Sequence, residues 1–96
     1  MSTSATLRLD GALTIVTSQL HRQRLLDAAH GAQDELLLDL SGVDAFDTAG
    51  VQLLLATRKT MAARAGRLGV PTASGVVIEV LAIFGLEALL RRPTSA

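Results

Sequence analysis

The amino-acid sequence predicts a small α/β domain in which helices alternate with the strands of a mixed sheet. Apolar residues alternate near the start of the chain, and a short apolar run over 35–40 has the length of a buried strand. Predicted helices precede and follow that run, so its neighbouring strands are expected to join it in parallel through right-handed crossovers. The 96 residues suffice for one core, and because neither a repeat nor a linker divides them, we expect a single domain over 1–96.

The chain is expected to open with a β-hairpin. Apolar residues alternate over 7–9 and 13–15, on either side of Asp10-Gly11. Asp-Gly between alternating apolar residues is a strong signal for two antiparallel strands joined by a tight turn. The first helix is then expected over 18–31, where good helix formers end at a glycine.

Two further strand and helix units complete the prediction. They are a strand over 35–40 that Ser41-Gly42 ends, a helix over 48–65, a weak strand over 68–70 before Pro71, and a helix between Ser74 and Gly85. The last helix is expected to bury Val77, Val80, Leu81 and Phe84, which recur at the spacing of one helix face. The predicted order is therefore hairpin, helix, strand, helix, strand, helix.

Composition excludes several functional classes. The chain has no cysteine, so a thiol nucleophile, a disulfide framework and a cysteine-based zinc site are excluded. Nine basic and nine acidic residues give a net charge of zero, and Phe46 and Phe84 are the only aromatic residues. Nucleic-acid binding depends on clustered cations and stacked aromatic side chains, so we expect no nucleic-acid partner.

The apolar stretch over 75–90 is not expected to enter a membrane. It is shorter than the ~20 residues that a spanning helix needs, and it contains Glu79 and Glu87. The first ten residues lack the basic and then apolar order of a secretory signal. We therefore expect a cytoplasmic protein without membrane insertion.

Candidate catalytic residues are few. Asp39, Asp44 and Asp47 form a local group, but carboxylates at strand ends and before helices are usually turn formers and caps, so a small hydrolase is the less favoured hypothesis. His21 and His30 lie nine residues apart, not at the spacing that lets two imidazoles share a metal, and we expect both at the surface. We predict no catalytic residue, no metal site and no cofactor.

Four basic residues follow one another at the end of the second helix and after it. They are Arg58, Lys59, Arg64 and Arg67. Such residues usually form a solvated helix face, and the alternative is a contact with an acidic partner.

The segment 39–52 stands apart from the rest of the chain. A buried strand ends, Phe46 turns back toward the core, and Asp47-Thr48 begins the next helix. Thr48 is expected to be exposed, and its hydroxyl has two interpretations. It could cap the helix, as Asp47 also could, or it could accept a phosphate that changes docking while it leaves the fold intact.

The run DLSGVDAFDTAGVQLLLATRK over 39–59 resembles the signature of STAS domains, the family of the bacterial anti-sigma factor antagonists. LDGALTI over 9–15 resembles the first hairpin of that family, and VPTASGVVIEVLAIFGL over 70–86 resembles its last strand and helix. The resemblance implies a single STAS-like α/β domain without enzymatic activity. Its mixed sheet would have four to five strands, backed by about three to four helices.

The resemblance also implies a site. In the antagonists the residue after the motif aspartate is the phosphorylated hydroxyl, and Thr48 matches it. The unphosphorylated protein binds a GHKL-type kinase that acts as an anti-sigma factor and thereby frees the sigma factor, and phosphorylation by that kinase reverses the binding. The partner-binding residues implied here are Asp44, Asp47, Thr48, Ala49, Gly50 and Gln52.

The motif departs from the usual antagonist pattern. Antagonists usually carry DSSG or DSTG followed by Leu-Gly, whereas this chain has DTAG over 47–50 followed by Val-Gln, and Thr14 stands where many antagonists carry aspartate. The DTAG form is similar to the STAS subunit of the bacterial lipid-asymmetry ABC transporter, which docks on the ATPase subunit, and to small STAS proteins associated with chemotaxis operons. These alternatives imply docking at Thr48 without phosphorylation. The oligomeric state does not follow from the sequence.

Overall fold

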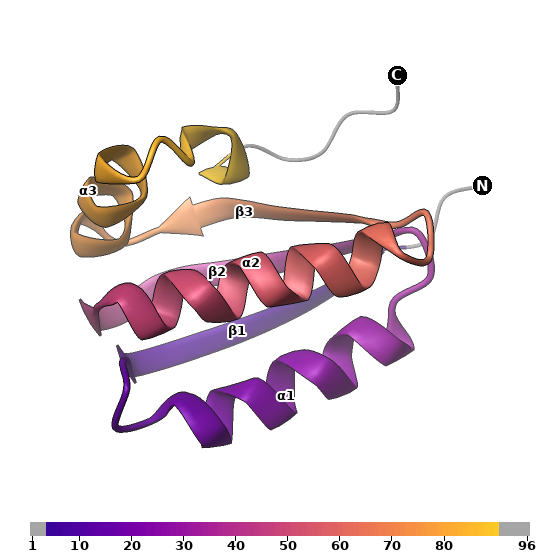
Figure 1. The fold of residues 1–96 in the computed structure, drawn as a ribbon, viewed down its shortest axis with the longest axis horizontal. Helices are drawn as coiled ribbons and strands as arrows, with labels where there is room; N and C mark the ends of the chain where they lie inside the picture. Colours follow the sequence, from indigo (N-terminus) through magenta and orange to yellow (C-terminus); the bar gives the residue numbers. More distant parts are fainter. Residues whose placement is uncertain (1–3, 91–96) are drawn as a thin grey trace.

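The computed structural model describes residues 4–90, which form a three-stranded parallel sheet with α1 and α2 on one face (Figure 1). The elements are β1 (Ser4–Leu13), α1 (Ser18–Gly31), β2 (Glu35–Phe46), α2 (Thr48–Ala62), β3 (Arg67–Ala73), α3 (Gly75–Ile83) and the 3-10 helix η1 (Glu87–Leu90). The α/β class and the three predicted helices are confirmed. Four to five strands are not confirmed, and the ends of the expected domain, 1–3 and 91–96, lie outside the described residues.

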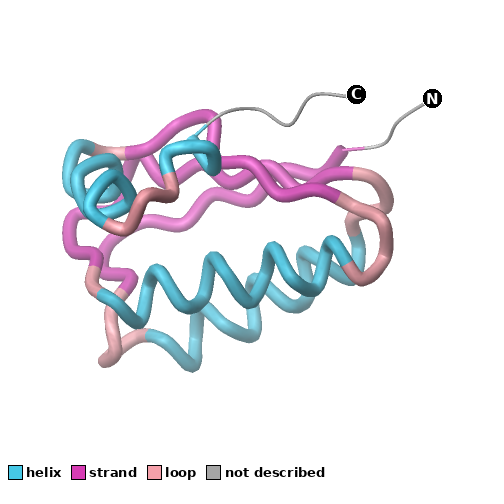
Figure 2. Tube along the Cα trace, turned by 45° about the horizontal axis from the view of Figure 1, so that its top comes forward, coloured by secondary structure: helices cyan, strands magenta, loops and turns pink. Residues whose placement is uncertain are grey.

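The strand order places both crossover helices together. β2 lies between β1 and β3, and both pairs are parallel. Two right-handed crossovers that move in the same direction across a sheet leave their helices on the same face. Figure 2 shows α1 and α2 side by side beneath the strands, with α3 and η1 away from them near β3.

The predicted hairpin is wrong, because β1 continues through Asp10-Gly11 as one strand parallel to β2. Gly11 has a φ of +78°, the conformation expected at a tight turn, but the chain kinks there without reversing. β1 pairs with a longer segment of β2, and the register shifts twice, so β2 absorbs two extra residues as bulges. Leu9 and Leu13, on either side of the kink, are both fully buried in the core.

β2 is longer than predicted because it continues to pair with β1 beyond Asp10-Gly11. The strand does not stop at Ser41-Gly42 but continues through it to Phe46, and one bulge lies at this point. A Cβ on Gly42 would come within 2.0 Å of the Asp10 carboxylate, so a larger residue here would displace the Asp10 side chain. β3 likewise continues past Pro71, which lies at a register shift on an edge strand, where its missing N–H is tolerated.

The core lies between the sheet and the helices. Leu36, Leu38 and Leu40 alternate along β2 and are fully buried. Phe84, predicted to be buried, is 48% exposed, because α3 ends at Ile83 and the chain turns at Gly85 with a φ of +69°. Across residues 4–90 no helix has the length and apolar character needed to cross a membrane.

Candidate functional site

The start of α2 is capped by Asp47. Its Oδ1 accepts hydrogen bonds from the backbone N–H groups of Ala49 at 2.9 Å and Gly50 at 3.3 Å. These are amides of the first turn, which have no partner inside the helix. Of the two capping candidates in the sequence, the aspartate therefore performs this structural role.

Thr48 is the first residue of α2, and its side chain is exposed. In the part of the chain that the structure describes, no group forms a hydrogen bond with its hydroxyl. Because Asp47 provides the cap, a chemical change at the Thr48 hydroxyl does not remove a bond that holds the helix. The positive end of the helix dipole also favours negative charge at this position.

The second oxygen of Asp47 holds the turn that joins β1 to α1. Its Oδ2 accepts a hydrogen bond from the Ile15 N–H at 3.1 Å. In the same turn the Thr17 hydroxyl donates to the Ala12 carbonyl at 2.8 Å, and His21 Nε2 donates to that carbonyl at 2.9 Å. Asp47 therefore connects the turn to the start of α2.

His21 corrects the expectation that both histidines lie at the surface. Its side chain is only 4% exposed, whereas His30 is exposed as predicted. His21 is buried because it faces the end of β1, where it bonds to Ala12. Its role in this structure is to fix the turn.

Three large apolar side chains beside this turn are open to solvent. Ile15 is 71% exposed, Val16 88% and Leu20 63%, and we call these three residues the apolar rim. Sequence reasoning missed them, because the predicted hairpin placed Ile15 in a strand that faces the core. Exposed aliphatic side chains that gather in one place are typical of interaction surfaces.

The other predicted site residues lie around Thr48 but differ in exposure. Gln52 on α2 is exposed and Ala49 is half-buried. Asp44 is exposed and is the extra residue at a bulge in the pairing of β2 with β1. Gly50 is buried, and a Cβ there would come within 2.6 Å of the Leu13 carbonyl oxygen and the Phe46 ring. Gly50 thus lies beneath the surface and permits α2 to approach β1.

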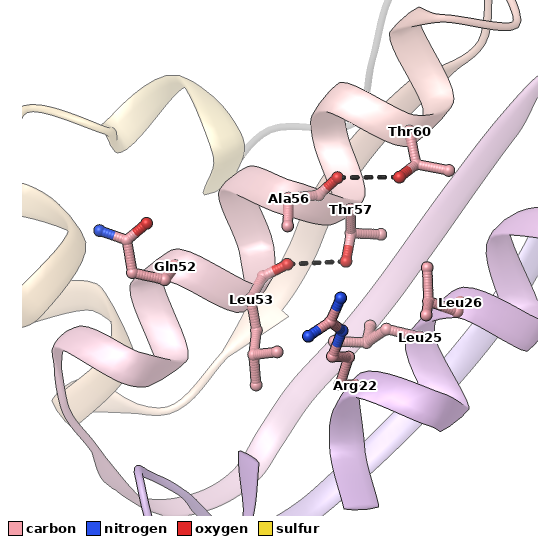
Figure 3. A pocket seen from close by; sticks show the side chains of 8 residues that line it. All are labelled: Arg22, Leu25, Leu26, Gln52, Leu53, Ala56, Thr57 and Thr60. Carbon is pink, nitrogen blue, oxygen red and sulfur yellow. Dashed lines mark hydrogen bonds between the residues drawn. The ribbon is translucent and has the colours of Figure 1, made fainter. Parts of the chain in front are cut away.

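A groove runs between α1 and α2 from this end of the sheet. Its first part, of about 300 Å³, is lined by residues that include Ile15 and Ala49, and its second part, of about 360 Å³, reaches Thr60. Both parts share Arg22, Gln52 and Leu53, so they adjoin one another. Figure 3 shows the second part, with the Arg22 side chain lying between the two helices. We call this feature the α1–α2 groove.

The carboxylates of the predicted acidic group do not share one environment. Asp39 accepts hydrogen bonds from the Ser41 hydroxyl at 2.6 Å and the Ser41 N–H at 3.0 Å, and Arg8 donates to it at 3.2 Å. The Ser41 bonds, with a smaller contribution from Arg8, hold the pKa of Asp39 below its ordinary value. Asp47 instead bonds to backbone N–H groups, and no cluster of three metal-ligating side chains occurs between residues 4 and 90.

Comparisons with known proteins agree with this fold. A structural match links the chain to the anti-sigma factor antagonist SpoIIAA, solved in its unphosphorylated form, with a TM-score of 0.78, 22% sequence identity, and coverage of 99% of this chain and 84% of that one. No curated protein matches the sequence. The family model described as "Mlab, STAS domain" matches residues 2–91. The chain therefore belongs to the STAS domain family.

Proposed function

We propose that the chain is a non-enzymatic interaction module of the anti-sigma factor antagonist type. It docks a GHKL-type serine/threonine kinase or anti-sigma factor through the start of α2, and phosphorylation of Thr48 switches the docking off. One observation supports this proposal above all. The Thr48 side chain is exposed, and Asp47 caps the helix in its place. The fold shared with the antagonist SpoIIAA supports it.

The docking surface lies at the carboxyl end of the parallel strands. Thr48 and Gln52 are exposed there. Ile15 and Val16 of the apolar rim belong to the turn that Asp47 joins to α2, and Leu20 follows in α1. In open α/β sheets this end is the usual place for ligands, because the loops after the strands gather there. Aliphatic side chains supply the area that a partner buries, and polar residues around them set its orientation.

Phosphorylation changes this surface without removing a structural bond. The Thr48 oxygen attacks the γ-phosphorus of ATP held by the kinase, the bond to the β–γ bridging oxygen breaks, ADP leaves, and the hydroxyl proton passes to a base of the kinase. The product carries about 1.5 to 2 additional negative charges beside Asp47. Burying that charge against an apolar partner surface is costly, so docking is lost.

A second candidate is an accessory subunit that docks on the ATPase of a lipid-transport ABC transporter. The resemblance of DTAG over 47–50 to that subunit favours it. The same exposed surface would be buried, and Thr48 would serve as a docking contact without being phosphorylated. A STAS protein associated with chemotaxis would use the surface in the same way.

A pull-down from native lysate tests the docking and separates the candidates. The baits are the wild-type chain, Thr48→Glu, and Thr6→Glu as a matched control on the exposed face of β1. We expect the wild type and Thr6→Glu to retain a kinase or anti-sigma factor that Thr48→Glu loses. Recovery of an ABC ATPase would replace the first candidate by the second, and equal recovery with all three baits would reject docking at Thr48.

Incubation with the captured kinase and ATP tests the phosphorylation. We expect the intact mass of the wild type to increase by one phosphate and the mass of Thr48→Ala to stay unchanged. If the wild-type mass does not change, the phosphorylation switch is wrong even where docking holds.

A further inference from the structure

The α1–α2 groove extends away from the Thr48 end of the molecule. Along α2 it runs from Ala49 to Thr60, a length of about 17 Å or roughly three helical turns. Its floor is apolar, since Leu25 and Leu53 are almost fully buried there, and Ala56 on its wall leaves space between the helices. The groove is open along its length, which suits an elongated occupant better than a small enclosed ligand.

The two helices that form the groove are basic, although the whole chain is neutral. They carry Arg22, Arg24, Arg58 and Lys59 against a single carboxylate, Asp27, which accepts a hydrogen bond from Gln23 Nε2 at 2.9 Å. Between residues 4 and 90 none of these four cations forms an ion pair. Arg22 lines both parts of the groove, so an unpaired positive charge lies at its centre.

We infer that the partner places an acidic amphipathic helix in the α1–α2 groove. A third helix laid along two neighbouring helices buries one apolar stripe, and anchors at i, i+3 or i+4, i+7 and i+11 span about the length available here. Carboxylates beside that stripe would pair with Arg22. Of the basic residues that could be a solvated face, Arg58 and Lys59 lie on α2 outside the groove lining, so Arg22 is the cation that gives the groove its charge complementarity.

This inference rests on the proposed function and specifies its partner. The groove begins at Ala49, the residue after Thr48, and Ile15 of the apolar rim lines its first part. A phosphate on Thr48 would therefore lie at the mouth of the groove and repel an acidic helix. A single modification could then weaken both the contact with the apolar rim and the contact in the groove.

Photo-cross-linking identifies the occupant directly. p-Benzoylphenylalanine replaces Ala56 inside the groove, and Ala62, exposed on α2 outside it, serves as the control position. We expect irradiation in native cells to join position 56, but not position 62, to a partner peptide that is rich in Asp and Glu and has aliphatic residues at helical spacing. The absence of a cross-link at 56, or a cross-link to a basic segment, a lipid or a second copy of this chain, would overturn the inference.

Charge reversal separates this inference from the docking at Thr48. Arg22→Glu reverses the charge in the groove, and Arg24→Glu makes the same change on α1 away from the groove lining. We expect Arg22→Glu to weaken partner binding by about tenfold or more and Arg24→Glu to weaken it far less. Circular dichroism and the urea midpoint establish that both variants are folded.

The patterns of loss are distinguishable. If Thr48→Glu loses the partner and Arg22→Glu retains it, the groove inference is wrong and the proposed function stands. If Arg22→Glu loses the partner and Thr48→Glu retains it, the switch at Thr48 is wrong and the groove inference stands. Arg22-dependent binding to phosphatidylglycerol vesicles, without a peptide cross-link at position 56, would point to a membrane surface and overturn the inference.

Discussion

The two ends of the parallel sheet use the same kind of side chain in opposite ways. At the amino end, Leu36 is fully buried and Leu68, its partner in β3, is 7% exposed. At the carboxyl end, the Ile15 and Val16 side chains are 71% and 88% exposed. Leu36 and Leu68 stabilise the fold, whereas Ile15 and Val16, which follow the buried Leu13, are available to a partner.

The ends also differ in what holds them in place. At the carboxyl end, Asp47 accepts a hydrogen bond from the turn, and Thr17 and His21 donate to the Ala12 carbonyl, so the turn does not need its own aliphatic side chains in the core. A turn fixed by polar contacts can keep apolar side chains in solvent in a defined position. This domain therefore separates the aliphatic residues that stabilise it from those that we propose bind its partner.

The largest effect that can test this separation belongs to Leu36. Leu36→Ala removes a fully buried side chain from the central strand and leaves a cavity, so we expect a loss of about 2–5 kcal/mol in the free energy of unfolding. Val16→Ala, the control at the other end, should change it by less than about 0.5 kcal/mol. Urea unfolding measures both, and similar losses in the two variants would contradict the separation.

Gly50 tests how tightly α2 approaches β1 near the site. A Cβ at this position would come within 2.6 Å of the Leu13 carbonyl oxygen and the Phe46 ring, so the first turn of α2 must shift. We expect Gly50→Ala to lower the free energy of unfolding by about 1–3 kcal/mol. Gly31→Ala, where a Cβ has open space, is the control. If Gly50→Ala is as stable as this control, the close approach is not required.

The sequence predicts the helices far better than the first strands. α1 agrees with its predicted bounds and α2 begins where predicted, because caps, glycines and periodicity act locally. The hairpin failed since Asp10-Gly11 has the same local chemistry in a turn and in a kinked strand, and only pairing with β2 decides between them. A bulge depends on contacts with residues about thirty positions away, which no local pattern records.

The site follows the same rule. The exposed position of Thr48 and the capping ability of Asp47 are visible in the sequence, because both depend on the start of one helix. The apolar rim and the α1–α2 groove are not, since each depends on how β1, α1 and α2 meet. Only the structure also shows that the second oxygen of Asp47 reaches Ile15.

Asp47 contributes both to stability and to the proposed docking surface, since it caps α2 and holds the exposed turn. Asp47→Ala removes the acceptor of three backbone N–H groups, and we expect a loss of about 0.5–2 kcal/mol in the free energy of unfolding. The affinity for the partner should fall by more than the lost stability accounts for, because the turn that carries Ile15 loses its hydrogen bond to Asp47. Glu79→Ala, at an exposed carboxylate on α3 away from the proposed docking surface, is the control. Unchanged amide exchange at Ile15 in Asp47→Ala would contradict the link.

The smallest effect is expected at Asp39, on the sheet face opposite Leu38 and Leu40. The Ser41 hydroxyl and N–H, with Arg8, lower the pKa of Asp39 in the folded protein. A lowered pKa means that the carboxylate stabilises the fold above its ordinary value of 3.8 and that this contribution is lost as the pH falls through the folded pKa. Asparagine cannot ionise, so Asp39→Asn should lose less stability than the wild type between about pH 7 and pH 3 in urea unfolding. Asp44→Asn controls for the general effect of removing a carboxylate, and an equal acid sensitivity of the wild type and Asp39→Asn would contradict this role for the Ser41 bonds.

Since Asp39 lies away from the apolar rim and the α1–α2 groove, the variant should bind the partner normally at neutral pH. Asp39→Asn would then change acid stability without changing docking, whereas Asp47→Ala changes both.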